Sequence, residues 1–283
     1  MSTTNSLTIV VDSCDRYDSV PYQFKAVAEE WSRNGGRVSV VDRPDATLDG
    51  DLVIAHVDLT VVPETYRRAF AGHRRVLNAA VTDISKRRIS RNLITSPDQW
   101  DGPVIIKTDL NHGGWPELDR FRERGLAARA LGKLVRRAPW QVTGMLSAAH
   151  YPVFAHPRDV PWFVWRHPRL VVEKLRPEKR GDLYCLRQHI FLGDRAIDTI
   201  LYARHPVVKA GNIVRRETLD GPPPEILALR REFGFDFGKF DYAISDGEVV
   251  VYDVNRTPSF GDDPEGRERH TARVLTPGLA AFL

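Results

Sequence analysis

The 283-residue sequence has little cysteine and no long apolar run. Its two cysteines, Cys14 and Cys185, are too few for a disulfide framework or a cysteine metal cluster, which is typical of a reducing compartment. No segment approaches the ~18 consecutive apolar residues of a membrane-spanning helix, and the N-terminus lacks the pattern of a signal peptide. We therefore expect a cytoplasmic protein without a membrane partner.

The sequence also lacks a strong excess of charge. Its 41 basic and 37 acidic residues give a net charge of +4, which suits an anionic small substrate but does not by itself indicate nucleic acid. The arginine-rich stretch 116–137, predicted to be one long helix, is typical of a solvated face, with a nucleic-acid surface as the weaker alternative. The oligomeric state cannot be read, and a homodimer is one option.

Alternating strand and helix patterns dominate the first part of the chain. Apolar runs at 7–11, 38–41, 52–57 and 76–81 predict strands, with an amphipathic helix over 22–34 and a short helix opened by Pro63 between them. Strands that alternate with helices favour a small parallel α/β domain over residues 1–82. A chain of this length has room for further subdomains, which we place at 83–175 and 176–283.

The most informative stretch is 239–260, which predicts two strands around an Asp246-Gly247 turn. The first strand contains Asp241, and the second ends in Asp253-Val254-Asn255. Because side chains alternate along a strand, Asp253 and Asn255 share a face. Two carboxylates and an amide oxygen are hard ligands that suit Mg²⁺ bridging nucleotide phosphates. An ordinary exposed hairpin is the alternative for this stretch taken alone.

The register of this hairpin decides whether the two carboxylates can share a metal ion. A two-residue Asp246-Gly247 loop with regular pairing would set Asp241 opposite Tyr252 and turn Asp253 to the other face. A loop of three or five residues, or one bulge, would pair Asp241 with Asp253. Although the Asp-Gly signal favours the tight turn, we expect the wider loop.

Three further features precede the hairpin. Lys107 ends the apolar strand 103–108, the loop Asn111–Gly114 follows it, and the strand 170–175 ends in Glu173-Lys174-Leu175. In this order the phrases GPVIIKTDLNHGG, LVVEKLRPEKRGDLY and FGKFDYAISDGEVVVYDVNRTPS resemble the ATP-grasp superfamily, which includes D-alanine–D-alanine ligase and glutathione synthetase. The resemblance covers most of residues 83–260, and the last phrase is its most specific part.

The resemblance implies roles in binding ATP. Lys86 and Lys107 would contact phosphates, although the 21 positions between them are fewer than usual. Gly113 and Gly114 would cover phosphates, or serve another purpose, since the usual second strand does not follow them. The 66 positions from Lys107 to Glu173 exceed the usual gap and imply an insertion. Adenine would meet the Glu173 carboxylate and the backbone of the hinge segment, which consists of Glu173, Lys174 and Leu175. Ribose would meet Glu178 or Asp182.

The resemblance also implies the reacting groups. Asp241, Asp253 and Asn255 would hold Mg²⁺, with Mn²⁺ as a substitute, and Lys239 would stabilise the transferred phosphoryl group or a developing oxyanion. A mid-strand arginine needs a partner, so Arg187 would bind phosphate or form a structural ion pair. The basic segment 203–216 would hold an anionic or carboxylate substrate, or be a plain connection; its cations are Arg204, Lys209, Arg215 and Arg216.

Together these features predict an α/β chain with a small parallel-sheet N-terminal domain and an ATP-grasp fold of two α+β lobes. The reaction implied is an ATP- and Mg²⁺-dependent ligation of a small-molecule carboxylate to an amine through an acyl phosphate. A kinase-like phosphotransferase is the alternative, because some ATP-grasp folds transfer phosphate to other acceptors. A basic nucleic-acid-binding protein is the alternative from a different class.

Overall fold

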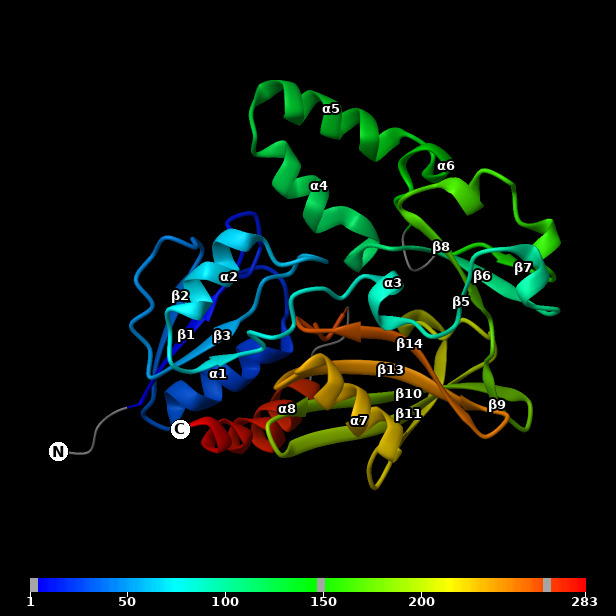
Figure 1. Cartoon of the computed structure of the whole chain (residues 1–283). Helices are drawn as coiled ribbons and strands as arrows, with labels where there is room; N and C mark the ends of the chain where they lie inside the picture. The colour runs from blue at the N-terminus through cyan, green and yellow to red at the C-terminus, as the bar shows by residue number, and fades with distance from the viewer. Residues whose placement is uncertain (1–4, 147–150, 262–265) are drawn as a thin grey trace.

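The computed structural model describes residues 5–146, 151–261 and 266–283, and it contains three β-sheets with helices around them (Figure 1). The sheets lie within residues 6–77, 93–174 and 178–255. The predicted α/β class with a small parallel sheet at the N-terminus is therefore confirmed. None of the helices in the described ranges is long and apolar enough to span a bilayer.

The N-terminal sheet is parallel and has the strand order β2-β1-β3-β4. Its elements are β1 (Ser6–Val10), α1 (Gln23–Arg33), β2 (Arg37–Val41), β3 (Leu52–Ala55), α2 (Glu64–Ala71) and β4 (Val76–Leu77). All four residues of β3 are buried, as an apolar run in a covered parallel sheet should be. Helix α1 ends before Gly35, whose φ of +88° favours glycine. Pro63 precedes the first turn of α2 instead of occupying it, one residue from the prediction.

The middle sheet forms the first lobe and has the order β5-β8-β6-β7, with every pair antiparallel. Its strands are β5 (Leu93–Ile94), β6 (Val104–Thr108), β7 (Val153–Phe154) and β8 (Leu170–Lys174), and the short helix α3 (Lys86–Ile89) precedes them. Val104, Ile106 and Val172 pack in one apolar core on this sheet. The predicted strand ends at Lys107 and Glu173 are thus brought onto adjacent strands.

The single long helix predicted over 116–137 is wrong. The chain forms α4 (Trp115–Arg122) and α5 (Leu126–Arg137), which are followed by α6 (Trp140–Thr143). The break falls at Gly125, whose φ of +131° lies outside helical geometry and is strained for other residues. Figure 1 shows α4 and α5 as a hairpin that projects above the N-terminal domain.

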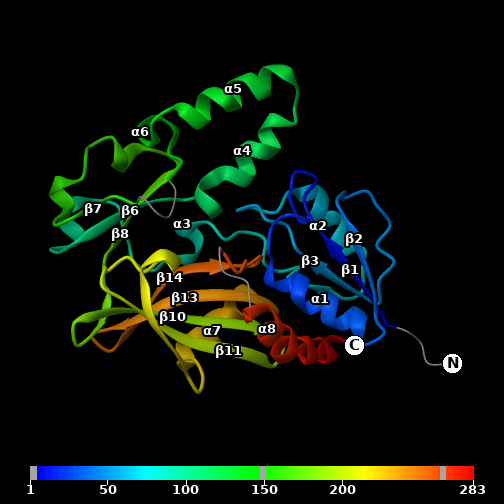
Figure 2. The same ribbon diagram turned by 180° about the vertical axis from the view of Figure 1, so that it is seen from behind.

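The third sheet, in the second lobe, has the order β12-β11-β10-β13-β14, with β9 also paired to β10. Its strands are β9 (Glu178–Arg180), β10 (Leu183–Leu192), β11 (Arg195–Ala203), β12 (Ile213–Thr218), β13 (Phe237–Ser245) and β14 (Glu248–Asn255). Helix α7 (Pro224–Phe233) covers one face, where Ile226 and Leu229 pack with Phe191 and Phe240. Helix α8 (Arg267–Leu275) contacts both β11 and α1, so the end of the chain returns to the N-terminal domain (Figure 2).

The β13–β14 hairpin corrects the predicted wider loop. Ser245 pairs with Glu248 across a two-residue turn in which Asp246 and Gly247 have φ of +53° and +80°. The register shifts farther along, so that Tyr252 is an extra residue on β14 and Asp241 pairs with Asp253. A bulge, the other option considered, therefore places the two carboxylates on one face.

Arg256 joins the second lobe to the N-terminal domain. It is fully buried just after β14, and its guanidinium donates to the carbonyls of Val57 at 2.9 Å and Val81 at 2.6 Å, and also to those of Leu59 and Thr60. Burial without a carboxylate partner lowers its pKa to about 10. The carbonyls of Val57 and Thr60 also accept backbone NH groups, whereas Arg256 is the donor that reaches those of Leu59 and Val81.

We predict that Arg256→Met lowers the free energy of unfolding by ~3 kcal/mol or more, because it leaves the carbonyls of the buried residues Leu59 and Val81 without this donor. Urea unfolding of the purified protein measures this. Arg195→Met is the matched control, since Arg195 is an exposed arginine whose loss should change stability by at most ~0.5 kcal/mol. Equal stability of the two variants would show that Arg256 does not hold the domains together.

Candidate functional site

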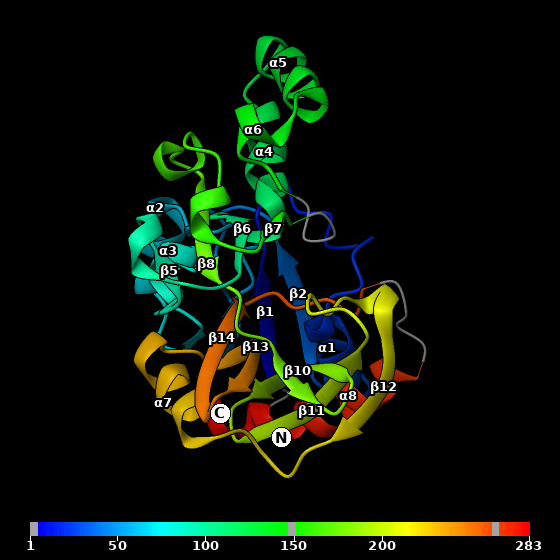
Figure 3. The ribbon, with the colours of Figure 1, turned by 90° about the vertical axis from the view of Figure 1, so that its right-hand side faces the viewer.

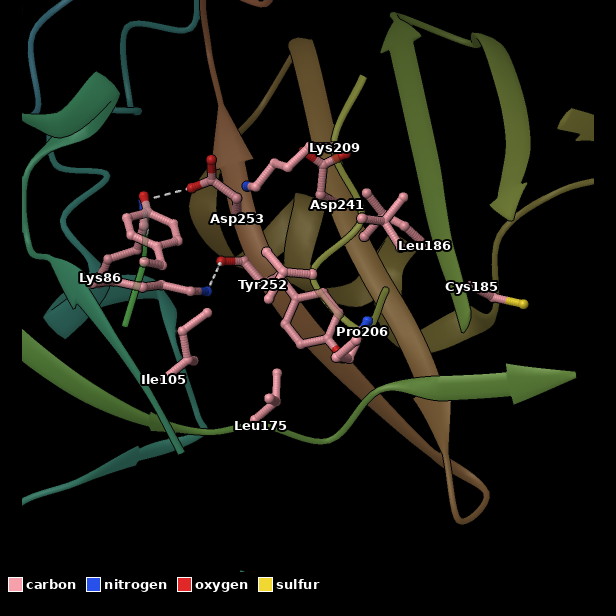
Figure 4. A pocket seen from close by; sticks show the side chains of 14 residues that line it. Lys86, Ile105, Leu175, Cys185, Leu186, Pro206, Lys209, Asp241, Tyr252 and Asp253 are labelled. Carbon is pink, nitrogen blue, oxygen red and sulfur yellow. Dashed lines mark hydrogen bonds and ion pairs between the residues drawn. The ribbon is translucent and has the colours of Figure 1, made fainter. Parts of the chain in front are cut away.

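A cavity lies between the two lobes, bounded by β6 and the hinge segment on one side and by β13, β14 and the 206–209 segment on the other (Figure 4). One part of its wall is apolar and includes Ile105, Leu175 and Leu186. The polar wall consists of Lys86, Lys107, Lys209, Asp241 and Asp253, and the remaining lining residues are Tyr151, Cys185, Pro206, Val207, Val208 and Tyr252. An apolar cavity with a few converging charges is the usual form of a small-ligand site.

Lys86 and Asp253 form an ion pair across the lobes at 2.5 Å. Lys86 is buried on α3, and burial alone would lower its pKa, but the Asp253 carboxylate outweighs burial and raises it. Burial would likewise raise the pKa of Asp253, and Lys86 and then Lys107 reverse this and lower it. Both groups are therefore held in their charged forms.

Lys107 also reaches from the first lobe to the second. Its ammonium donates to the backbone carbonyl of Tyr252 at 3.1 Å and lies 2.5 Å from the Glu173 carboxylate. Glu173 is buried, does not line the cavity, and leaves its second oxygen without a hydrogen-bond partner among the described residues. In this structure Glu173 therefore neutralises Lys107 instead of facing an adenine site.

Lys209 is the one predicted cation of the 203–216 segment that lines the cavity. Burial, reinforced by the neighbouring Lys107 charge, lowers its pKa. Among the described lysines of the lining it alone forms no ion pair, and its ammonium lies 5.2 Å from the centre of the Tyr151 ring. The three arginines of the segment are exposed and line no part of this cavity; they are Arg204, Arg215 and Arg216.

The predicted metal ligands lie at the polar end. Asp241 and Asp253 face each other in the hairpin register and both line the cavity. Lys239 contacts Asp241 at 2.9 Å, and this carboxylate outweighs the effect of burial and raises the pKa of Lys239. Asn255 pairs with Lys239 in the hairpin, is buried, and accepts from the backbone NH of Thr257 at 2.8 Å.

The two facing carboxylates fit Mg²⁺, which takes one or two protein carboxylates together with substrate phosphates. Asn255 fits less well as a direct ligand, because its side-chain oxygen already accepts the Thr257 hydrogen bond. Among the described residues no three histidines, cysteines or acids assemble as a metal site. A metal ion bound here would therefore complete its shell with phosphate oxygens and water.

The glycine loop lies elsewhere. Gly113 and Gly114 have φ of +73° and +84° and lie against the Leu146 carbonyl and the Leu110 side chain, away from the cavity lining. Asn111 donates to the Asp58 carboxylate at 2.9 Å, which ties the loop to the N-terminal domain. The structure thus places this loop at a domain junction and gives no support to the phosphate-covering role.

Glu178 and Arg187 form a buried two-pronged ion pair at 2.8 and 2.9 Å, and Glu178 also accepts from the backbone NH of Ile244 at 2.9 Å. This arrangement corresponds to the structural alternative for Arg187 and leaves Glu178 little capacity for ribose. Asp182 is exposed in the β9–β10 turn, and the Lys174 ammonium lies 5.1 Å from the centre of the Trp100 ring. None of these four lines the cavity.

The sequence reasoning missed Tyr151 and Tyr252. Both line the cavity, and burial raises the pKa of the Tyr151 hydroxyl to about 12. The sequence held a signal for Tyr252. If the turn has two residues and Asp241 pairs with Asp253, the second strand must contain one bulged residue, and Tyr252 is that residue. Nothing in the sequence near Tyr151 marks it, because the α4–α6 insertion separates it from Lys107.

A second cavity lies at the carboxyl ends of β1 and β3, where the strand order of the N-terminal sheet reverses, a usual place for ligands. Its lining includes Asp12, Asp15, Tyr22 and Asp58, with the start of α4 opposite. Burial raises the pKa of Asp15 to about 7, although the Tyr22 hydroxyl donates to it at 2.9 Å. Thr257, two residues beyond Asn255, donates to Asp58 at 2.6 Å.

Comparisons with known proteins place the fold. No protein-family model matches the chain, and no curated protein matches it by sequence. The ATP-grasp ligase PsnB, solved with a minimal precursor, Mg and ADP, matches with a TM-score of 0.53 and 13% identity over 100% of this chain and 99% of that chain. The macrocyclase MdnC from Microcystis aeruginosa MRC, bound with precursor peptide MdnA, matches with a TM-score of 0.53 and 10% identity over 96% and 99%.

D-alanine–D-alanine ligase from Bacillus anthracis, complexed with ATP, matches with a TM-score of 0.51 and 11% identity over 99% of this chain and 96% of that chain. These similarities extend over nearly the whole of each chain, the N-terminal domain included. The chain has the fold of the ATP-grasp superfamily.

Proposed function

We propose that this chain is an ATP- and Mg²⁺-dependent ligase that joins a carboxylate to an amine through an acyl phosphate. The observation that carries the proposal is the convergence of three lysines and two register-matched carboxylates on one end of an otherwise apolar interlobe cavity. Similarity in fold to ATP-grasp ligases supports the same reading.

The two ends of the cavity suit the two ends of ATP. The apolar wall, with Ile105, Leu175 and Leu186, would contain the adenine ring. Lys209, which is half-buried and lacks a carboxylate partner within the described chain, would pair with phosphate at low cost, because it has no existing ion pair to break. Lys86 and Lys107 would turn from their carboxylates toward phosphate oxygens, and a flexible ammonium suits this movement.

Asp241 and Asp253 would hold Mg²⁺, which would neutralise charge on the phosphate chain. The substrate carboxylate would attack the terminal phosphorus, the bond to ADP would break, and an acyl phosphate would form. The amine would then attack the acyl carbon, lose a proton, and expel inorganic phosphate. Lys239, beside Asp241, would stabilise the negative charge that develops in these steps.

The cavity between β1, β3 and α4 is our candidate for the substrate side of the reaction. Asp58 is linked through Thr257 to the end of the metal hairpin, so a group bound near Asp58 would lie on the same side as the phosphoryl donor. Some structures of similar fold were solved with precursor peptides, so both small-molecule and peptide carboxylates are compatible with this proposal.

Release of ADP and phosphate in a screen of acids with amines tests the proposed ligase function. Turnover without any amine would instead indicate a kinase-like phosphotransferase.

Mg-ATP should stabilise the folded protein, because a ligand that binds only the native state raises stability by mass action. At about 100 times its Kd the gain is ~2.7 kcal/mol. A thermal scan with millimolar Mg-ATP should show an upward shift of the melting temperature. Mg²⁺ with AMP serves as the control and should shift it less. No shift with ATP would oppose the proposed nucleotide site.

Loss of a metal carboxylate should abolish turnover. We expect Asp253→Asn and Asp241→Asn each to lower kcat by about 100-fold or more. Asp253→Asn should also lower stability, because Lys86 stays buried without its partner, whereas Lys239 is 20% exposed and tolerates the loss of Asp241 better. Asp246→Asn in the exposed turn is the matched control. Near-normal kcat in both site variants would rule out the metal assignment.

Lys107 should have two separable roles. Lys107→Ala should weaken ATP binding and also destabilise the protein by ~3–5 kcal/mol, because Glu173 is left as an unpaired buried carboxylate. Adding Glu173→Gln should recover much of the stability without restoring ATP affinity. Calorimetric titration of ATP and urea unfolding measure the two effects. If ATP binds the double variant as it binds the unaltered protein, Lys107 is purely structural.

A further inference from the structure

The α4–α5 hairpin presents an apolar face to solvent. Helix α5 packs on α4 through a narrow strip, where Gly132 lies against the Arg122 side chain. Leu131 and Leu134, three positions apart and therefore on one face of the helix, are 50% and 65% exposed, and Leu126 is 82% exposed. Figure 3 shows the hairpin standing away from the three sheets. Leucines repeated on one exposed helix face indicate an interaction surface.

The charge of the hairpin is one-sided. Residues 115–137 contain seven basic and three acidic side chains, a net charge of +4 that equals the net charge of the whole chain. The Asp119 carboxylate is already shared by Arg16, Arg122 and Arg136. The other basic side chains of α5, which are Arg129, Lys133 and Arg137, form no ion pair with any residue in the described ranges.

The basic edge of α5 leads to the N-terminal domain. A depression adjoins the cavity at the ends of β1 and β3 and shares Cys14, Arg16 and Asp119 with it. Its other lining residues are Arg122, Glu123, Arg129 and Arg136. The path from the exposed leucines to that cavity is thus lined mainly by arginines. A partner with carboxylates would meet the four arginines of the depression, which outnumber its two acids, before it reaches the aspartates of the cavity, and its leucines would cover the apolar face.

We propose that the exposed face of α5 docks an acidic amphipathic peptide segment. Leucines of the peptide would cover Leu131 and Leu134, and its carboxylates would pair with Arg129, Lys133 and Arg137. The further step, that the docked segment brings a carboxylate or amine to the cavity beside Asp58, rests on the proposed ligase function. Docking itself does not depend on nucleotide.

Other occupants fit this face less well. A second copy docked through the same face would bring two surfaces of net charge +4 together, which costs free energy at physiological salt. Helices that lie on a membrane insert Trp, Phe and Leu side chains, and α5, with the sequence LAARALGKLVRR, offers leucine but no aromatic residue. Leucines that interrupt the basic residues also give nucleic acid little to contact beyond its phosphates.

A binding measurement on the full chain without ATP tests the docking surface. The probe is a fluorescein-labelled peptide of about 18 residues, five helical turns, with leucines on one face and glutamates on the other. A matched probe has lysines in place of the glutamates. Fluorescence anisotropy should show at least about tenfold tighter binding of the glutamate probe, and binding should weaken with added salt.

Paired variants locate the site. Two double variants should each weaken binding of the glutamate probe by about tenfold or more. One combines Leu131→Ser with Leu134→Ser, and the other combines Lys133→Glu with Arg137→Glu. Val214→Ser and Arg195→Glu replace an exposed valine and an exposed arginine elsewhere and should leave binding unchanged. All these side chains are exposed, so the melting temperatures should stay close to that of the unaltered protein.

Several outcomes would overturn the proposal. These are equal binding of both probes, unchanged binding by the α5 variants, or capture of the protein by phosphatidylglycerol vesicles or an oligonucleotide in preference to the probe. Loss of a dimer in sedimentation of the leucine variants would assign the face to a second copy. The rise in melting temperature with Mg-ATP is measured on the same samples and does not depend on peptide binding. Failure of the proposed ligase function can therefore be told apart from failure of the docking surface.

Discussion

The arrangement of the site depends on one constraint, which is that buried ammonium groups need anionic partners. The side chains of Lys86 and Lys107 extend from the first lobe to the second, where they contact Asp253 and the Tyr252 carbonyl respectively. Without a nucleotide, Lys86 and Lys107 bind groups of the protein itself, and their contacts with Asp253 and the Tyr252 carbonyl join the two lobes. A phosphate chain would offer the same lysines a different partner, so closure of the lobes and capture of nucleotide use the same charges.

The hairpin shows how a local irregularity serves a site. A regular two-residue hairpin would turn Asp253 away from Asp241, and the extra residue Tyr252 restores the shared face. The bulge also aims the Tyr252 carbonyl at Lys107 and leaves its ring in the cavity wall. One inserted residue therefore places both carboxylates on one face, contacts a lysine and lines the interlobe cavity.

The N-terminal domain is held to this hairpin by the residues that directly follow it. Arg256 satisfies loop carbonyls after β3 and β4, and Thr257 donates to Asp58 at the carboxyl end of β3. Only four positions thus separate Asp253, in the interlobe cavity, from Thr257, which contacts Asp58 in the cavity at the ends of β1 and β3. The α4–α5 hairpin borders the same crevice, so its basic surface lies beside the candidate substrate cavity.

The sequence by itself predicted the parallel N-terminal sheet, the strands that contain Lys107 and Glu173, and the two strands of the β13–β14 hairpin, because alternation, apolar runs and an Asp-Gly turn are local signals. The family resemblance pointed to Lys86, Lys107, Asp241 and Asp253, and the basic segment 203–216 pointed to Lys209. Only the tertiary structure decided which carboxylate each lysine meets, that Arg187 is taken by Glu178, that the glycine loop faces the N-terminal domain, and that Tyr151 reaches the cavity. Most of these contacts join residues that are far apart in the chain. Burial and charge pairing stabilise the contacts, and a local sequence pattern does not show which distant residues will meet.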